Sequence, residues 1–209
     1  GVMIDKFVPD MFYQSIYRVD YEKLKNVGIK LIIFDLDNTI ATYSESIPRS
    51  EAKELIDKLK EMGFNVILMS NSNKSRVLPF RNALEIDSCA NAKKPLTSGY
   101  KKIMKVYHLD ANKIACIGDQ LITDIWGANK MGMTSILVNP MSKKDRKITY
   151  INRFFEKILF KIMDKEELFK NRLAQSSGTL EKPVVLRQLR KEIARLKTVL
   201  TEREMDGEK

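Results

Sequence analysis

The sequence predicts an α/β fold with a doubly wound parallel sheet, followed by an α-helical hairpin. Short apolar runs alternate with helical patterns over roughly the first 140 residues, which is typical of a parallel sheet with crossover helices. Acids and hydroxyls follow the ends of several of these runs. From about residue 164 the composition changes and no further strand pattern appears. We therefore expect two domains, residues 1–163 and residues 164–209.

Composition narrows the classes of protein that the chain can be. Of its 209 residues, 44% are hydrophobic and 31% are charged, which is typical of a soluble globular protein. No apolar stretch reaches the roughly 20 residues of a membrane-spanning helix. Cys89 and Cys116 are the only cysteines, and Cys116 lies in an apolar run, so we expect two reduced thiols and a cytoplasmic location. The single histidine, His108, argues against a histidine-rich metal site, so we expect catalysis to rest on carboxylates.

The segment 28–40 contains the first predicted core strand and the first candidate catalytic residues. Its aliphatic run predicts a buried parallel strand, at whose carboxyl end Asp35 and Asp37 follow. Ligands bind at such strand ends in open α/β sheets. Two carboxylates so spaced suit a divalent ion and a phosphoryl group, because one acid can ligate and attack while the other moves a proton. A turn or a helix N-cap explains the same short pattern.

The elements on either side follow from their periodicity. The aromatic segment 7–20 predicts an arm packed on the sheet, although a membrane-facing element is a second interpretation. A helix is predicted from a Ser50 N-cap to a stop at Gly63. A second buried strand is expected over 64–69, and it ends at a polar segment that begins with Ser70 and Asn71.

The rest of the first domain continues the alternation. A helix over 74–84, interrupted at Pro79, precedes Lys94, and a further helix is expected over 98–107. The third buried strand ends at Asp119, and Asp124 follows a little over one helical turn later. A helix of small residues ending at Gly132 and a strand over 134–138 complete the domain.

Four motifs at these strand ends resemble those of the haloacid dehalogenase-like superfamily. They are Phe-Asp-Leu-Asp-Asn-Thr, Met-Ser-Asn-Ser-Asn, Lys-Lys-Pro and Ile-Gly-Asp-Gln-Leu-Ile-Thr-Asp, in this order. Residues 1–163 look most similar to the YqeG-type phosphatases of subfamily III. Taken singly, Ser70 is better explained as a helix cap, Lys94 as a solvated charge and Asp124 as a helix-surface residue, but their order and position together favour an active site.

The resemblance implies a role for each matching residue. Asp35 would be the nucleophile that forms an aspartyl-phosphate, and Asp37 the general acid and base. Lys94 would neutralise developing charge. Thr39, Ser70, Asn71 and Lys94 would contact the substrate phosphate. Mg²⁺ would be held by the carboxylates of Asp35 and Asp119 and by the backbone carbonyl of Asp37, with Asp124 contributing directly or through water.

The spacing of the motifs bears on the substrate. Neither 39–69 nor 70–93 leaves room for a sizeable lid domain, so we expect an open site and a phosphate carried on something large, such as a lipid, a protein or an oligonucleotide. The resemblance points to phosphatidylglycerophosphate in particular. An amphipathic helix predicted over 148–163 fits peripheral contact with an anionic membrane, and packing on the sheet or a neighbouring helix explains it equally well.

The C-terminal segment has a different chemistry. The net charge of +10 lies largely after residue 140. One predicted helix there has a narrow apolar seam, and its other faces carry Arg187, Arg190, Lys191, Arg195 and Lys197. This pattern fits a solvated hairpin, but it also fits binding to a phosphate backbone.

Residues 165–203 resemble the bacterial large-subunit ribosomal protein number twenty-nine, although the family's usual N-terminal start is missing. The resemblance implies a two-helix hairpin that binds large-subunit rRNA, and hence association with the ribosome. The alternative function is therefore that of a structural ribosomal protein with a fused phosphatase domain as a passenger.

Overall fold

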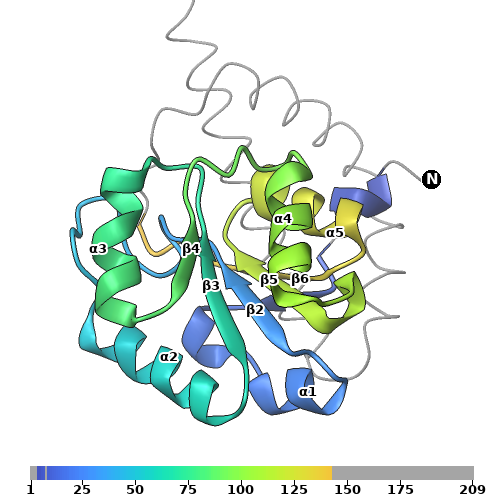
Figure 1. The fold of residues 1–209 in the computed structure, drawn as a ribbon, viewed down its shortest axis with the longest axis horizontal. Helices are drawn as coiled ribbons and strands as arrows, with labels where there is room; N and C mark the ends of the chain where they lie inside the picture. Colours follow the sequence, from blue (N-terminus) through green and yellow to red (C-terminus); the bar gives the residue numbers. More distant parts are fainter. Residues whose placement is uncertain (1–3, 8, 143–209) are drawn as a thin grey trace, which may run out of the picture. The chain divides into compact units, whose positions relative to one another are not determined.

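The structure, a computed structural model, describes residues 4–7 and 9–142. In this part of the chain a six-stranded sheet has the order β1-β6-β5-β2-β3-β4 (Figure 1), and every neighbouring pair is parallel. The strands are β1 (Met11–Tyr13), β2 (Leu31–Phe34), β3 (Asn65–Met69), β4 (Asp87–Cys89), β5 (Ile114–Gly118) and β6 (Thr134–Val138). The helices are α1 (Tyr21–Asn26), α2 (Ser50–Glu61), α3 (Lys74–Leu84), α4 (Ser98–Tyr107) and α5 (Gly127–Met131), with a π-helix at Leu121–Trp126 and 3₁₀ turns at Ile4–Phe7, Ile16–Arg18 and Ala111–Lys113. The predicted parallel α/β fold is confirmed.

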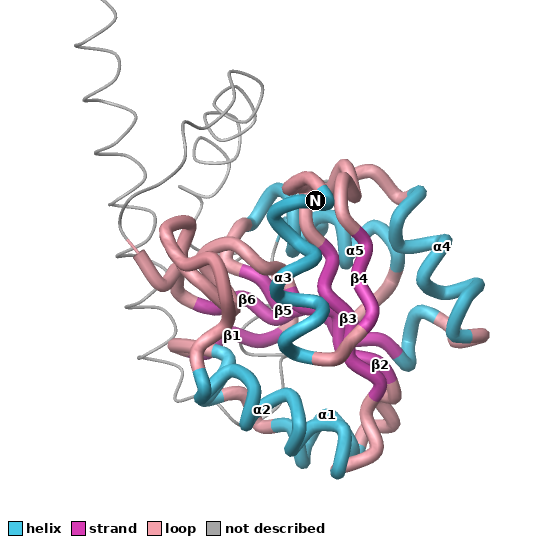
Figure 2. The backbone as a smooth tube through the Cα atoms, turned by 60° about the vertical axis from the view of Figure 1, so that its left-hand side comes forward, coloured by secondary structure: helices cyan, strands magenta, loops and turns pink. Residues whose placement is uncertain are grey.

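The central strands are apolar throughout because helices cover both faces of the sheet. Figures 1 and 2 show α2 and α3 on one side of the strands and α4 and α5 on the other. Every residue of β2 and β5 is buried. On the α4 side, Ile33 and Cys116 pack in one apolar cluster with Tyr100 of α4 and Ala128 of α5. This burial on both faces is the reason that the runs read as continuous rather than alternating.

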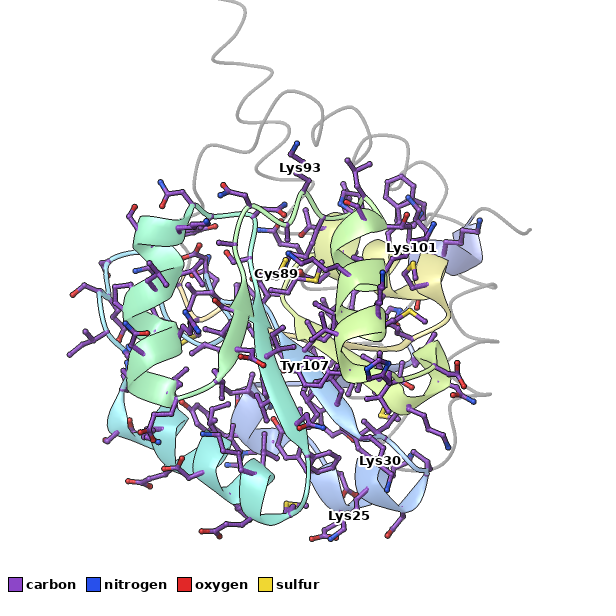
Figure 3. The ribbon with its side chains drawn as sticks, in the orientation of Figure 1. Lys25, Lys30, Cys89, Lys93, Lys101 and Tyr107 are labelled. Carbon is purple, nitrogen blue, oxygen red and sulfur yellow. The ribbon has the colours of Figure 1, made fainter. Side chains whose placement is uncertain are left out.

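The strand order determines which loops meet. Strand β2 lies between β5 and β3, with Phe34 opposite both Ile117 and Leu68. The residues that follow these three strands therefore emerge side by side at one edge of the sheet. In Figure 3 this is the edge at which Lys93 is labelled, whereas Lys30, just before β2, lies at the opposite end. The crevice outside the strand ends is where α/β folds bind ligands.

Two predicted helix features are wrong in detail. Helix α3 runs unbroken through Pro79. Its buried residues Val77, Phe80 and Leu84 offset the roughly 3 kcal/mol that an internal proline costs, since each buried apolar side chain contributes about 1.5–3 kcal/mol. Ser50 is the first residue of α2 rather than its cap. Arg49 occupies the N-cap position without a side-chain cap bond.

Two short edge strands were not predicted as strands. The N-terminal arm was expected to pack on the sheet, and its residues Met11–Tyr13 extend the sheet as β1. Asp10 anchors this arm, because its Oδ2 accepts a hydrogen bond of 2.9 Å from the backbone N–H of Ser135. Strand β4 forms the opposite edge. Three residues are too few to show a period of two.

Several further predictions about helix ends, strand bounds and cysteines are confirmed, and two concern residues that the structure does not describe. Gly63 follows α2 with a φ of +92°, and α4 and β6 have the predicted bounds. Both cysteines are free thiols. No helix within 4–7 or 9–142 is long and apolar enough to cross a membrane. The helix predicted over 148–163 and the hairpin predicted within 164–209 lie outside the described residues.

Candidate active site

Three carboxylates converge at the edge of the sheet where β2 and β5 end. Asp35 follows β2, Asp119 follows β5, and Asp124 lies in the π-helix after β5. One carboxylate oxygen from each lies within 4.8 Å of the other two. Gly118 makes this approach possible, because a Cβ at this position would overlap the carboxylate of Asp124. Gln120, four residues before Asp124, orients the Asp124 side chain, because the backbone N–H of Gln120 donates to Asp124 Oδ2 at 3.1 Å.

Lys94 supplies the positive charge of this cluster. Its buried ammonium lies 2.6 Å from Asp35 Oδ1 and 2.6 Å from Asp124 Oδ1. Asn71 holds the loop that presents it: the Asn71 amide donates to the carbonyl of Lys94 at 3.0 Å, and its oxygen accepts from the backbone N–H of Lys94 at 2.7 Å. Both hydrogen bonds of the Asn71 side chain are thus made to the backbone of Lys94.

The charges of the cluster perturb one another. Burial raises the pKa of Asp35 to about 7, with a further contribution from Asp124, while Lys94 acts in the opposite direction. Burial and the neighbouring Asp35 and Asp124 likewise raise the pKa of Asp119 well above its ordinary value. Burial lowers the pKa of Lys94, but Asp124 and Asp35 outweigh it and the pKa is raised, so the lysine stays charged. Such excess negative charge, partly neutralised, is typical of a site that takes up a cation.

Asp37 meets a different set of partners from Asp35. Its Oδ2 accepts a hydrogen bond of 2.7 Å from Ser72 Oγ. Its Oδ1 accepts from two nitrogens of Arg76, Nε at 3.0 Å and Nη2 at 2.9 Å. Sequence reasoning missed both Ser72 and Arg76. Arg76 lies on α3, whose pattern indicated only a helix, and no spacing rule relates it to the segment 35–39.

Hydroxyl and amide groups line the loop between these two sets of charges. Thr39 Oγ1 donates to Asp119 Oδ1 at 3.2 Å, so it contacts a candidate metal ligand. Ser70 is buried at the end of β3, and its Oγ accepts from the backbone N–H of Ser72 at 3.0 Å. Asn38 has a φ of +64°, which turns the chain sharply after Asp37. Its carbonyl accepts a 2.9 Å bond from the N–H of Met141, a contact that the sequence did not indicate.

The structure thus groups the predicted residues in three ways. The first group is Asp35, Lys94, Asp119, Asp124 and Thr39: Lys94 pairs with Asp35 and Asp124, Thr39 bonds to Asp119, and oxygens of the three carboxylates lie within 4.8 Å of one another. Asp37 is adjacent in sequence but is held by Ser72 and Arg76. Ser70 and Asn71 shape the neighbouring loops. Arg187, Arg190, Lys191, Arg195 and Lys197 lie outside the described residues.

Comparison with known proteins gives two family matches. The family model described as mitochondrial PGP phosphatase matches residues 3–141, and that of the ribosomal L29 protein matches residues 163–203. The probable phosphatase YqeG of Bacillus subtilis (strain 168) is 36% identical over 151 residues, which cover 72% of this chain and 88% of that protein.

Two further relatives cover smaller shares. The chloroplastic phosphatidylglycerophosphate phosphatase 1 of Chlamydomonas reinhardtii is 26% identical over 144 residues, 65% of this chain and 54% of that protein. The large ribosomal subunit protein uL29 of Natranaerobius thermophilus is 52% identical over 42 residues, 20% of this chain and 65% of that protein. Both resemblances read from the sequence are therefore confirmed. Because the phosphatase family model spans more than half of the chain, and the match to the Bacillus relative covers most of that relative's length, the chain belongs to the mitochondrial PGP phosphatase family and is a phosphatase.

Proposed function

We propose that this phosphatase is a Mg²⁺-dependent phosphomonoester hydrolase that uses Asp35 as a covalent nucleophile on a large or membrane-borne substrate. One observation carries the proposal: the cluster of buried Asp35, Asp124 and Lys94 with half-buried Asp119, beside which Asp37 is held separately. A nucleophile and a proton-transfer group with different neighbours are what a two-step phosphoryl transfer needs.

In the first step, a carboxylate oxygen of Asp35 attacks the phosphorus of the substrate. An aspartyl-phosphate bond forms and the bond from phosphorus to the substrate oxygen breaks. Asp37 gives its proton to that oxygen, and an alcohol leaves. Lys94 stabilises the charge on the phosphoryl oxygens, and the hydroxyls of Ser70 and Thr39 would contact these oxygens.

In the second step, Asp37, now ionised, takes a proton from water. The water oxygen attacks the phosphorus, the bond to Asp35 breaks, and inorganic phosphate is released. Asp37 ends protonated and Asp35 ends ionised, so the enzyme is ready for another turnover. The balance is one phosphomonoester and one water converted to one alcohol and one phosphate.

The donor set of the cluster fits Mg²⁺. It consists of hard carboxylate oxygens, with the backbone carbonyl of Asp37 as a further candidate ligand, and it contains no histidine or cysteine. A bound Mg²⁺ would neutralise charge on the phosphoryl group and orient it. The raised pKa values of Asp35 and Asp119 fit this assignment, because burial and the neighbouring carboxylates disfavour their ionised forms and a divalent cation would offset both effects.

Two observations support a lipid-borne substrate. The segments that join β2 to α2 and β3 to α3 contain no inserted domain in the described chain. A site without a lid suits a phosphate whose own carrier excludes water. The algal relative is named a phosphatidylglycerophosphate phosphatase, and we propose the same lipid class here. Peripheral contact with an anionic membrane would follow.

A second candidate function concerns the C-terminal segment. We propose that residues 1–163 form the phosphatase domain and residues 164–209 a helical hairpin, a division supported by family matches that end at residue 141 and resume at residue 163. Arg187, Arg190, Lys191, Arg195 and Lys197 would then contact large-subunit rRNA and place the protein on the ribosome. Cosedimentation with large subunits, with and without residues 164–209, tests this candidate. Loss of pelleting on truncation is expected, and equal pelleting would contradict it.

A substrate panel tests the main proposal. Phosphatidylglycerophosphate in vesicles, nucleotides and phosphopeptides are offered to the parent and to Asp35→Asn, with Mg²⁺ and after chelation. We expect phosphate release that requires both Asp35 and Mg²⁺ and is fastest with the lipid. Hydrolysis by Asp35→Asn at the parent rate would overturn the mechanism. A preference for nucleotides or phosphopeptides would overturn the substrate assignment alone.

A further inference from the structure

We infer that Arg76 and Ser72 are positioning residues, which hold the carboxyl of Asp37 in the orientation for proton transfer and tie it to the loop 42–45. The inference rests on the proposed function, because it concerns how the acid and base of that reaction is held. It assigns a role to Ser72, a residue of the second motif to which the resemblance gave no role, and to Arg76, which lies outside the four motifs.

Both oxygens of Asp37 are held from the side of β3 and α3. The guanidinium of Arg76 approaches Oδ1 with Nε at 3.0 Å and Nη2 at 2.9 Å, and Ser72 Oγ lies 2.7 Å from Oδ2. The two side chains of the ion pair are 17% and 9% exposed, so solvent screens it only partly. A carboxyl with both oxygens bonded has a single orientation, which is what directed proton transfer requires.

Arg76 also fixes the backbone that follows Asp37. Its Nη2 donates to the carbonyl of Thr42 at 2.9 Å, and its Nη1 donates to the carbonyl of Glu45. The guanidinium lies 4.7 Å from the ring centroid of Phe80, one turn further along α3. The planar fork of arginine can make these contacts at once, whereas the ammonium of lysine is a compact point charge. The loop 42–45 and the carboxyl of Asp37 therefore share one support.

The site thus has two cations with separate tasks. Lys94 contacts Asp35 and Asp124, and Arg76 contacts Asp37. If Arg76 positions Asp37, its loss should affect reactions in proportion to their need for a general acid. An alkyl phosphate needs its leaving oxygen protonated, whereas p-nitrophenyl phosphate has a leaving group that departs without a proton.

The experiment compares kcat/KM for an alkyl phosphate and for p-nitrophenyl phosphate, because this constant reports the steps up to departure of the alcohol. The variants are Arg76→Gln, Arg76→Lys, Ser72→Ala and, as the control, Arg81→Gln. Arg81 lies on the same helix but lines a groove beside Tyr107 and β4, away from Asp37. Asp37→Asn defines the full loss of the general acid.

We expect Arg76→Gln to lower kcat/KM for the alkyl phosphate by about 10–100-fold, part of the 10²–10⁴ that general acid catalysis supplies, and to lower it several-fold less for the aryl phosphate. Ser72→Ala should change the ratio of the two constants in the same direction by a smaller factor, and Arg76→Lys should restore part of the loss. Arg81→Gln should leave the ratio unchanged. If Arg76→Gln fails to fold, Ser72→Ala decides, because it removes only a hydroxyl.

Equal losses for both substrates, or none, in Arg76→Gln and Ser72→Ala would overturn the inference while the parent and Asp37→Asn still differ. Failure of the proposed function looks different: the parent then releases phosphate from neither of these substrates nor from phosphatidylglycerophosphate in vesicles, or Asp35→Asn and Asp37→Asn match the parent on both substrates.

Discussion

Asp35 and Asp37 are two residues apart at the end of one strand, yet their surroundings differ. Asp35 is buried in a cluster with two other carboxylates and Lys94, and its pKa is raised to about 7, mainly by burial. Among the described residues, the side chain of Asp37 is held by a guanidinium and a hydroxyl and bonds to no acid. The spacing of the two acids does not by itself distinguish their roles. The residues that contact each acid, supplied by neighbouring strands and helices, give the two carboxyls different environments.

The largest effect is expected from Asp35→Asn. An amide cannot form the aspartyl-phosphate, so phosphate release should fall by at least about 10⁴-fold, comparable with loss of a nucleophile in other enzymes. Initial rates at saturating Mg²⁺ measure it. Asp57→Asn, which changes a carboxylate of α2 that pairs with Lys53, is the matched control and should keep the parent rate. A fall of less than ten-fold in Asp35→Asn would make the comparison between the two acids untenable.

Lys94→Met should lower kcat/KM by about 10²–10³-fold, the scale of losing one charge-stabilising group. Lys94 also lowers the pKa of Asp35, so its removal should raise that pKa and move the acid limb of the pH profile upward. Lys93→Met is the control. Lys93 precedes Lys94, and its side chain points away from the sheet (Figure 3). An unchanged acid limb in Lys94→Met would contradict the effect of Lys94 on the pKa of Asp35.

Mg²⁺ should stabilise the protein more at pH 8 than at pH 5. Without metal, folding raises the pKa of Asp35 to about 7, so this group's contribution to stability is present below its unfolded pKa of roughly 4 and is lost as the pH rises through 7. The raised pKa of Asp119 acts in the same direction. Because Mg²⁺ binds the ionised acids, it restores this loss.

Thermal unfolding with and without Mg²⁺ at the two pH values measures the difference. About 1 kcal/mol corresponds to roughly 2–4 °C for a chain of this size. We expect a Mg²⁺-dependent rise in Tm of at least that size at pH 8 and little or none at pH 5, with Asp119→Asn reducing the rise. A larger rise at pH 5 would mean that the cluster does not bind the ion through its carboxylates.

Thr39→Val should have the smallest effect. It removes the hydroxyl that donates to Asp119 Oδ1, a single hydrogen bond worth about 0.5–1.5 kcal/mol. The Mg²⁺ concentration for half-maximal activity should rise by roughly 2–10-fold, while Asp37-dependent proton transfer, read from the ratio of alkyl to aryl hydrolysis, stays the same. Thr97→Val, at the N-cap of α4 without a side-chain cap bond, serves as the control. If only the ratio of alkyl to aryl hydrolysis changed, Thr39 would act on proton transfer by Asp37 and not on metal binding by Asp119.

Much of this arrangement could be predicted from the sequence. Continuous apolar runs identify β2, β3 and β5, because strands buried on both faces exclude polar residues. The acids that follow them could be placed at one edge, since parallel strands end on the same side. The bounds of α4 and β6 also match the prediction.

What escaped prediction depends on contacts between distant segments. Strands β1 and β4 are too short for a periodic signal and exist through pairing with β6 and β3. Helix α3 tolerates Pro79 because of what it buries. Arg76 reaches Asp37 across 39 positions of sequence, and no local pattern marks it as part of the site. The acids and hydroxyls at the strand ends could therefore be identified from the sequence. The residues that hold them in place could be identified only from the fold.

The most direct test of the division between Asp35 and Asp37 is covalent trapping. Asp37→Asn is mixed with Mg²⁺ and p-nitrophenyl phosphate, whose leaving group departs without a proton, and is then quenched in acid and analysed by peptide mass spectrometry. The proposed mechanism predicts one phosphoryl group on the peptide that contains Asp35, because water is no longer activated to remove it, and none in the double variant with Asp35→Asn. Continued turnover of the parent with no phosphoryl group trapped at Asp35, or one trapped on another residue, would contradict it.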